Sequence, residues 1–245
     1  MYFITICPDE LYFHWQLQVQ HYNFIVKHKI APENIICLLG SKGEINLEFA
    51  QYCKKIGVKL INYDISNLDM SYKPIIRPNL LKRFYKDYPE FKEKYVFIHD
   101  SDIIFTKLPY FKGITNDNWY LSDCNNYLGY EYLKRFGNTL LTEMCNIVGI
   151  KQQLLLEKDN NCGGAQYYGN DLDWRFWEKV ENDTIKLFNV LKIQSEINKK
   201  EFFDIHNVEL GKNNAIQAWT AGMWADLWNL HLRKNVITHK ELDFS

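Results

Sequence analysis

The chain has 245 residues, of which 47% are hydrophobic and 24% charged, and its formal net charge at pH 7 is −1. This balance is that of an ordinary globular protein, and the length is within the range of one hydrophobic core. No long run of lysine or arginine is present, so the basic surface of a nucleic-acid-binding protein is not expected. We therefore expect one domain, residues 1–245, that binds neither DNA nor RNA.

The spacing of the cysteines and the lengths of the apolar runs indicate the cellular compartment of the protein. The six cysteines form no CxxC pair, and Cys7 and Cys37 lie inside apolar runs, where a thiol behaves as a small hydrophobic group. No apolar stretch approaches the roughly 18 residues of a membrane-spanning helix, and the run at 2–7 lacks the basic flank and the length of a signal-peptide core. We expect free thiols in a cytoplasmic protein without a membrane span.

The first hundred residues alternate between strand-like and helix-like patterns. Four short apolar runs, at 2–7, 34–39, 58–63 and 95–99, are predicted strands. Between them, apolar residues at helical spacing predict three helices. These residues are Trp15, Val19, Tyr22 and Val26, then Phe49, Ala50, Cys53 and Ile56, then Leu80, Leu81, Phe84 and Tyr85 after Pro78. The pattern is that of crossover helices on a mostly parallel sheet, so the predicted fold class is α/β.

The expected order of these strands predicts the position of a ligand-binding pocket. Crossovers between parallel strands are right-handed, and the commonest doubly wound order is 3-2-1-4. Ligands of such sheets bind beyond the carboxyl ends of the strands where the order reverses, here between the first and the fourth. The loops at Pro8–Asp9 and His99–Asp102 are therefore expected to face one pocket.

The second half of the chain is less regular. Residues 119–122 are predicted to form a further strand, and residues 173–191 and 219–232 are predicted helices. Residues 196–214 are too polar to assign. No linker rich in Gly, Pro or Ser separates the two halves, so this part is expected to be a C-terminal helical elaboration of the same domain.

The strongest chemical signal is Asp100-Ser101-Asp102, which lies between two apolar stretches. Alternate residues of an extended segment point the same way, so the two carboxylates are expected to converge while Ser101 turns aside. Convergent carboxylates repel each other unless a cation or a proton lies between them. Oxygen ligands of this kind favour Mg²⁺ or Mn²⁺, which complete their coordination with substrate phosphates.

An apolar strand followed by Asp-x-Asp resembles the DxD metal motif of GT-A glycosyltransferases. Three further segments, 161–168 (NCGGAQYY), 173–180 (DWRFWEKV) and 218–225 (AWTAGMWA), are similar to segments of hydroxyproline arabinosyltransferase-like and peptidyl-serine galactosyltransferase-like enzymes. The resemblance implies a Rossmann-like, mostly parallel sheet flanked by helices, a UDP-sugar donor, and transfer with retention of the anomeric configuration. Residues 1–105 would be the nucleotide-binding half and 106–245 the acceptor-side half.

Several residues are candidates for contact with the sugar or the acceptor. Gly163 and Gly164 would let the backbone approach a sugar closely or adopt a positive φ, and Gln166 would present its amide to hydroxyls or to the anomeric centre. Asp171 and Asp173 flank the start of the predicted helix 173–191. They either cap that helix or bind acceptor hydroxyls as part of the catalytic set.

Other candidates belong to the donor and the metal. Arg77 and Lys82 precede the fourth strand and either reach the diphosphate or lie on a solvated helix face. His239 is the candidate third metal ligand beside Asp100 and Asp102, because a late histidine resembles the arrangement in several retaining GT-A enzymes, and His206 is its rival. The remaining expected nucleotide contacts are Pro8, Asp9, Asp64 and Ser101.

We therefore expect a Mn²⁺- or Mg²⁺-dependent hexosyl- or pentosyltransferase that acts on a hydroxyl of a glycan, a protein or a small molecule. Gly222 stands where the related segment often carries an acidic residue, so this helix is not expected to supply a catalytic carboxylate. Two alternatives remain open. A sugar nucleotidyltransferase would normally show a Gly-rich loop where this chain has Cys7-Pro-Asp-Glu10, and a non-catalytic carbohydrate-binding module would use the aromatic residues without a nucleotide.

Overall fold

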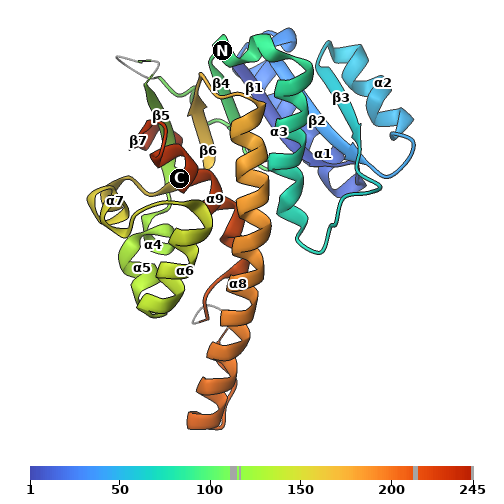
Figure 1. The fold of residues 1–245 in the computed structure, drawn as a ribbon. Helices are drawn as coiled ribbons and strands as arrows, with labels where there is room; N and C mark the ends of the chain where they lie inside the picture. The colour runs from blue at the N-terminus through green and yellow to red at the C-terminus, as the bar shows by residue number, and fades with distance from the viewer. Residues whose placement is uncertain (111–114, 116, 212–214, 244–245) are drawn as a thin grey trace.

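The computed structural model describes residues 1–110, 115, 117–211 and 215–243. A seven-stranded sheet forms the centre of this described part, with the strand order β3-β2-β1-β4-β6-β5-β7 (Figure 1). Strand β6 runs antiparallel to its neighbours β4 and β5, and the other adjacent pairs are parallel. The strands are β1 Tyr2–Pro8, β2 Ile35–Ser41, β3 Lys59–Asp64, β4 Val96–His99, β5 Asn118–Asp123, β6 Gly163–Gly169 and β7 Asn235–Thr238.

The predicted α/β class, a mostly parallel sheet flanked by helices, is confirmed. The order β3-β2-β1-β4 is the predicted one, and each of the first four strands lies within two residues of its predicted bounds. Every residue of β2 and of β4 is buried. Strands covered on both faces read as continuous apolar runs, and this is the reason that they could be recognised in the sequence.

Helices cover both faces of the sheet (Figure 1). On one face, α3, α8 and α9 enclose the larger core, which contains Phe84, Trp177, Trp224 and Trp228. On the other face, α1 and α2 cover a smaller core around Leu17 and Phe24. The helices are α1 Leu11–His21, α2 Leu47–Ile56, α3 Ile76–Asp87, α4 Asn125–Leu128, α5 Tyr130–Lys134, α6 Asn138–Val148, α7 Gln152–Glu157, α8 Trp174–His206 and α9 Ala221–His231.

The C-terminal helices differ from their predicted bounds. Helix α8 does not end near residue 191 but continues to His206, where Asn207 caps it in the left-handed conformation (φ 51°). Its second half projects beyond the sheet, so its polar composition, which suggested no element, is that of a solvated helix (Figure 1). Trp219 lies in a short 3₁₀ turn with 56% of its surface exposed, and α9 begins two residues later.

Helix α1 forms where it was predicted, but the apolar residues that predicted it face solvent. Trp15, Val19 and Tyr22 are about half exposed, whereas Gln16 and Gln20 on the opposite side are buried. A π-helical segment, Tyr22–Lys27, continues the helix. Within the described residues, no helix combines the length and the apolar character that crossing a membrane requires.

Candidate functional site

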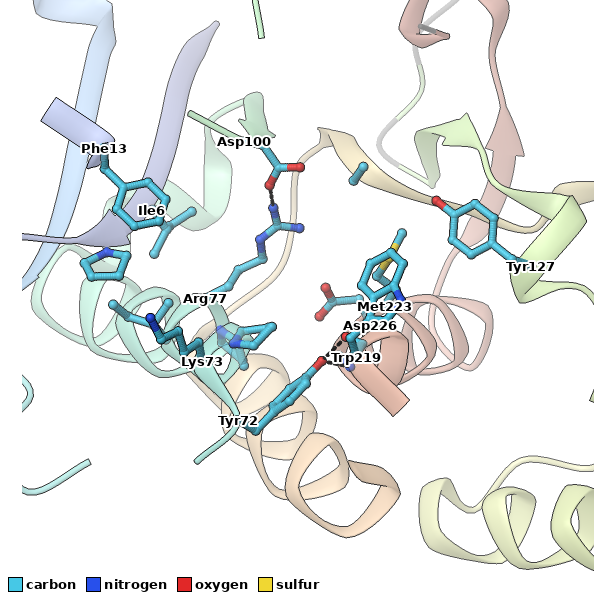
Figure 2. Close-up of a pocket in the computed structure, with 16 residues that line it drawn as sticks. Ile6, Phe13, Tyr72, Lys73, Arg77, Asp100, Tyr127, Trp219, Met223 and Asp226 are labelled. Carbon is cyan, nitrogen blue, oxygen red and sulfur yellow. Dashed lines mark hydrogen bonds and ion pairs between the residues drawn. The ribbon is translucent and has the colours of Figure 1, made fainter. Parts of the chain in front are cut away.

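A cavity of about 420 Å³ opens at the carboxyl ends of β1 and β4. Pro8 lines it from the end of β1, Asp100 from the residue after β4, and Arg77 from the first turn of α3 (Figure 2). Helix α9 forms the opposite wall. The remaining lining residues are Ile6, Phe13, Tyr72, Lys73, Pro74, Ile76, Pro78, Tyr127, Ala165, Trp219, Gly222, Met223 and Asp226.

Arg77 and Asp100 form an ion pair inside this cavity, through Nη2 of the guanidinium and Oδ1 of the carboxylate. The guanidinium also lies 5.6 Å from the centroid of the Tyr167 ring. Burial raises the pKa of Asp100; Arg77 opposes this effect, and the nearby charge of Asp102 adds to it. Burial would lower the pKa of Arg77, but the combined effects of Asp100, Tyr167 and Asp226 outweigh it and raise the pKa, so the guanidinium stays charged.

The loop that carries Asp100 is held from below by the polar side of α1. Ser101 Oγ donates a hydrogen bond of 2.7 Å to Gln16 Oε1, and Gln20 Nε2 donates one of 2.9 Å to the Asp100 carbonyl oxygen. Burial lowers the pKa of His99 to about 3, so its imidazole is neutral beneath the loop. Ser101 therefore turns aside from the cavity and holds the loop in position. It is not among the residues that line the first cavity.

Asp102 lines a second cavity, of about 580 Å³, together with Gln166. Gln166 is 3% exposed, and neither its Nε2 nor its Oε1 has a hydrogen-bond partner among the described residues. Asp100 and Ala165 line the first cavity, whereas their chain neighbours Asp102 and Gln166 line the second. The two cavities thus flank the same two short segments.

Neither candidate histidine is among the lining residues of the first cavity, and each has contacts of its own. The His239 Nδ1 atom accepts a hydrogen bond of 3.2 Å from the Glu241 N–H, and its ring packs edge-on against Tyr120. His206 is the last residue of the projecting α8, and its ring lies 4.4 Å from that of Phe202. In the described ranges, no group of three or more His, Cys, Asp or Glu side chains is arranged to hold a metal ion.

Five other sequence candidates have structural partners outside the first cavity. Asp171 pairs with Lys234 (2.6 Å) and Lys92 (3.5 Å), and the cap of α8 is Asp173, which accepts from the Arg175 and Phe176 N–H groups. Lys82 pairs with Glu181 rather than reaching the cavity. Asp9 pairs with His14 (2.7 Å), and Asp64 accepts from the Ser66 N–H (2.8 Å).

Gly163 and Gly164 serve packing rather than backbone freedom. Neither has a positive φ; among the neighbouring residues, the positive φ falls on Ala165 (60°), which lines the first cavity. A Cβ at Gly163 would lie 2.5 Å from Leu121 Cβ and 2.6 Å from the Ser122 carbonyl oxygen, and a Cβ at Gly164 would contact Met223 Cε. The glycines therefore allow β6 to lie close to β5 and α9.

Asp226 is the site residue that sequence reasoning missed. It lies on α9 one turn after Gly222, lines the first cavity and is 3% exposed, and its Oδ1 has no hydrogen-bond partner among the described residues. Burial raises the pKa of Asp226 to about 7, against the opposing effects of Arg77 and of the nearby Tyr167 hydroxyl. The sequence did contain a signal for Asp226. The resembling segments often carry an acidic residue at the position of Gly222, and Asp226 lies one helical turn later, on the same face of the helix.

No family model matches this chain, and no curated protein sequence matches it. Among solved structures, it is similar to the mannosyltransferase Ktr4p from S. cerevisiae, with a TM-score of 0.35 and 12% identity over 74% of this chain and 59% of that one. It is also similar to mouse xyloside xylosyltransferase 1, with a TM-score of 0.34 and 10% identity over 99% and 83% of the two chains. The chain thus spans less than two thirds of Ktr4p. At these values the similarity assigns no function to it.

Proposed function

We propose that this chain is a metal-dependent glycosyltransferase that moves a sugar from a UDP-sugar to a hydroxyl acceptor. The observation that supports this most is the meeting of Asp100, Arg77 and Asp226 in one cavity at the carboxyl ends of β1 and β4. A guanidinium binds phosphate oxygens, and carboxylates bind cations and hydroxyl groups. A nucleotide-diphosphate sugar with its bound cation provides all of these partners: phosphate oxygens, a cation and hydroxyl groups. Retention of configuration is proposed from the resemblance to retaining GT-A enzymes.

The lining of the cavity orients the donor. Phe13 and Ile6 provide an apolar end suited to a nucleobase, and Arg77 lies in the middle, where the diphosphate would be (Figure 2). Lys73 at the exposed rim is a second cation within the lining. The sugar would then lie at the α9 end, between Trp219 and Asp226.

The carboxylates fit a divalent cation that binds together with the donor. Mg²⁺ and Mn²⁺ commonly take one or two protein carboxylates and complete their coordination with water and phosphate oxygens, so a preformed cluster of three side chains is not needed. Arg77 pairs with Oδ1 of Asp100, and Asp102 is close enough to raise the pKa of Asp100. When bound, the cation would supply positive charge to the leaving diphosphate. Arg77 would hold the same diphosphate from the α3 side.

Asp226 would bind a hydroxyl group of the transferred sugar. Its Oδ1 is buried without a hydrogen-bond partner among the described residues at the proposed sugar end, and a buried carboxyl oxygen in that state gains from accepting a hydrogen bond. On the acceptor side, Gln166 lines the second cavity, and its amide donor and acceptor have no partner within the part of the chain that the structure describes. The acceptor hydroxyl would then reach the anomeric carbon past Asp102.

The proposal is tested by incubating the protein and Mn²⁺ with a panel of UDP-sugars and following the release of UDP and the anomer of the product by nuclear magnetic resonance. Release of UDP from one donor with an α-linked product from an α-linked donor supports the proposal. Formation of a UDP-sugar and pyrophosphate from UTP and a sugar 1-phosphate would instead identify a nucleotidyltransferase. Sugar binding that needs no nucleotide would identify a binding module.

A further inference from the structure

Helix α1 and the π-helical segment after it carry a continuous apolar face that points to solvent. We call it the α1 face, and it consists of Leu11, Tyr12, Trp15, Val19, Tyr22 and Val26, which are between 44% and 76% exposed. Residues at this spacing lie along one side of a helix, and the Tyr12 and Trp15 rings contact each other edge-on. A continuous exposed apolar stripe of this kind marks an interaction surface rather than scattered surface residues.

Hydrogen bonds on the buried side of the same helix fix which side faces solvent. Gln16 and Gln20 are buried and hydrogen-bond the loop of Asp100 and Ser101. Asn23 exchanges two hydrogen bonds with the Phe105 backbone, accepting from its N–H at 2.9 Å and donating to its carbonyl oxygen at 3.1 Å. Rolling the helix to bury the α1 face would break all of these bonds and leave buried polar groups unpaired. The fold therefore fixes the exposure of the α1 face.

Positive charge lies at the C-terminal end of the α1 face, whereas the exposed Glu10 precedes its N-terminal end. No acidic residue occurs between Leu11 and Pro32, whereas Lys27 and Lys29 follow the helix and are exposed. Lys27 Nζ lies 6.0 Å from the ring centroid of Tyr22, so this cation borders the face itself. The neighbouring α2, whose Tyr52 ring stacks at 6.0 Å on that of His21, has Glu48 in its first turn and Lys54 and Lys55 in its last.

We propose that the α1 face docks on a membrane surface that contains anionic lipids. Tryptophan and tyrosine are enriched at the headgroup level of bilayers, aliphatic side chains beside them enter the acyl boundary, and nearby lysines are attracted to anionic headgroups. The α1 face combines these three features in one helix that does not span the bilayer. Since the same helix holds the Asp100 loop, and Phe13 beside Tyr12 lines the first cavity, docking would keep that cavity at the lipid surface.

The test is co-sedimentation of the purified full chain with large vesicles, made either of equal parts phosphatidylglycerol and phosphatidylcholine or of phosphatidylcholine alone. The chain should sediment with the anionic vesicles and much less with the neutral ones, and added salt should release it. Trp15→Gln should weaken partitioning by about tenfold, and Lys27→Gln by about fivefold. Ile193→Gln, which changes an exposed residue of the projecting part of α8, is the matched control and should sediment like the unmodified chain.

Three results would overturn the proposal. One is the absence of sedimentation with the anionic vesicles, and another is sedimentation that Trp15→Gln and Val19→Gln leave unchanged. The third comes from light scattering without lipid: a dimer that Trp15→Gln dissociates would show that a second copy covers the face. Because these are surface positions, thermal unfolding of each variant should match that of the unmodified chain, and this check separates lost docking from lost folding.

Discussion

Arg77 on α3 pairs with Asp100, which follows β4, and it also interacts electrostatically with Asp226 on α9, so one guanidinium attracts two carboxyl groups that lie far apart in the sequence. This relationship joins the N-terminal half of the chain and the C-terminal helices in one cavity. It also opposes the effect of burial, which raises the pKa of Asp100. A diphosphate that enters the cavity offers Arg77 a second anionic partner, which would free Asp100 for a cation.

Asp100→Asn and Asp102→Asn should each lower transfer on the order of 100-fold, because a neutral amide binds a divalent cation far more weakly than a carboxylate. The far-ultraviolet circular dichroism should stay unchanged, since asparagine keeps the shape of the side chain. Asp204→Asn, at an exposed position near the end of α8, is the matched control. Undiminished turnover by Asp102→Asn would remove this residue from the site.

Asp226→Asn should change the pH dependence of stability. In the folded chain Asp226 keeps its proton up to about pH 7, whereas its ordinary pKa is 3.8. Between these values the folded state binds more protons than the unfolded state, so stability from this group falls as pH rises. Between about pH 5 and pH 8 the unmodified chain should lose roughly 2–3 kcal/mol more than Asp226→Asn. Urea unfolding at both pH values measures the difference; equal losses would contradict a raised pKa.

Asp226 should also matter for sugar selection. If its carboxylate accepts a hydrogen bond from a sugar hydroxyl, Asp226→Asn should lower kcat/KM by about tenfold or more for the preferred donor. A donor that lacks the bound hydroxyl should lose little further activity in this variant. UDP itself should bind equally well to both proteins, and a matching loss of UDP affinity would place Asp226 with the nucleotide instead.

The two glycines of β6 should respond differently to alanine. Gly163→Ala should destabilise the fold by about 1–3 kcal/mol or more, because the new Cβ meets Leu121 Cβ and the Ser122 carbonyl oxygen of β5, which cannot move alone. Gly164→Ala meets the flexible end of Met223 and should cost less than about 1.5 kcal/mol. Thermal unfolding of both variants compares them directly. Equal losses of stability in the two variants would show that the sheet and α9 accommodate an added Cβ equally well.

The first 105 residues could be predicted closely because their structure is local. Strands β1 and β2 are covered on both faces and therefore appear as unbroken apolar runs, and their order follows from the handedness of crossovers. The position of Asp100 at the reversal of strand order followed from these two facts. The GT-A resemblance added the expected chemistry.

The remaining features depend on contacts between distant segments. Periodicity showed that Trp15 and Val19 share a helix face, but the side that is buried depends on hydrogen bonds from Gln16 and Gln20 to a loop about 80 residues away. Asp226 became part of the site only because α9 packs across β6 toward Arg77. The ion pairs of Asp171 with Lys92 and Lys234 join segments that lie far apart in the sequence, so they could not be predicted from it.

The most direct test of the central claim is a calorimetric titration of UDP, GDP and their common sugar conjugates into the purified protein, with Mn²⁺ present and then with a chelator. We predict that one uridine nucleotide or its sugar conjugate binds with Mn²⁺, that the chelator abolishes or strongly weakens this binding, and that Asp102→Asn does the same. Binding that is indifferent to the chelator, or no binding of any nucleotide, would contradict the proposal of a metal-dependent glycosyltransferase.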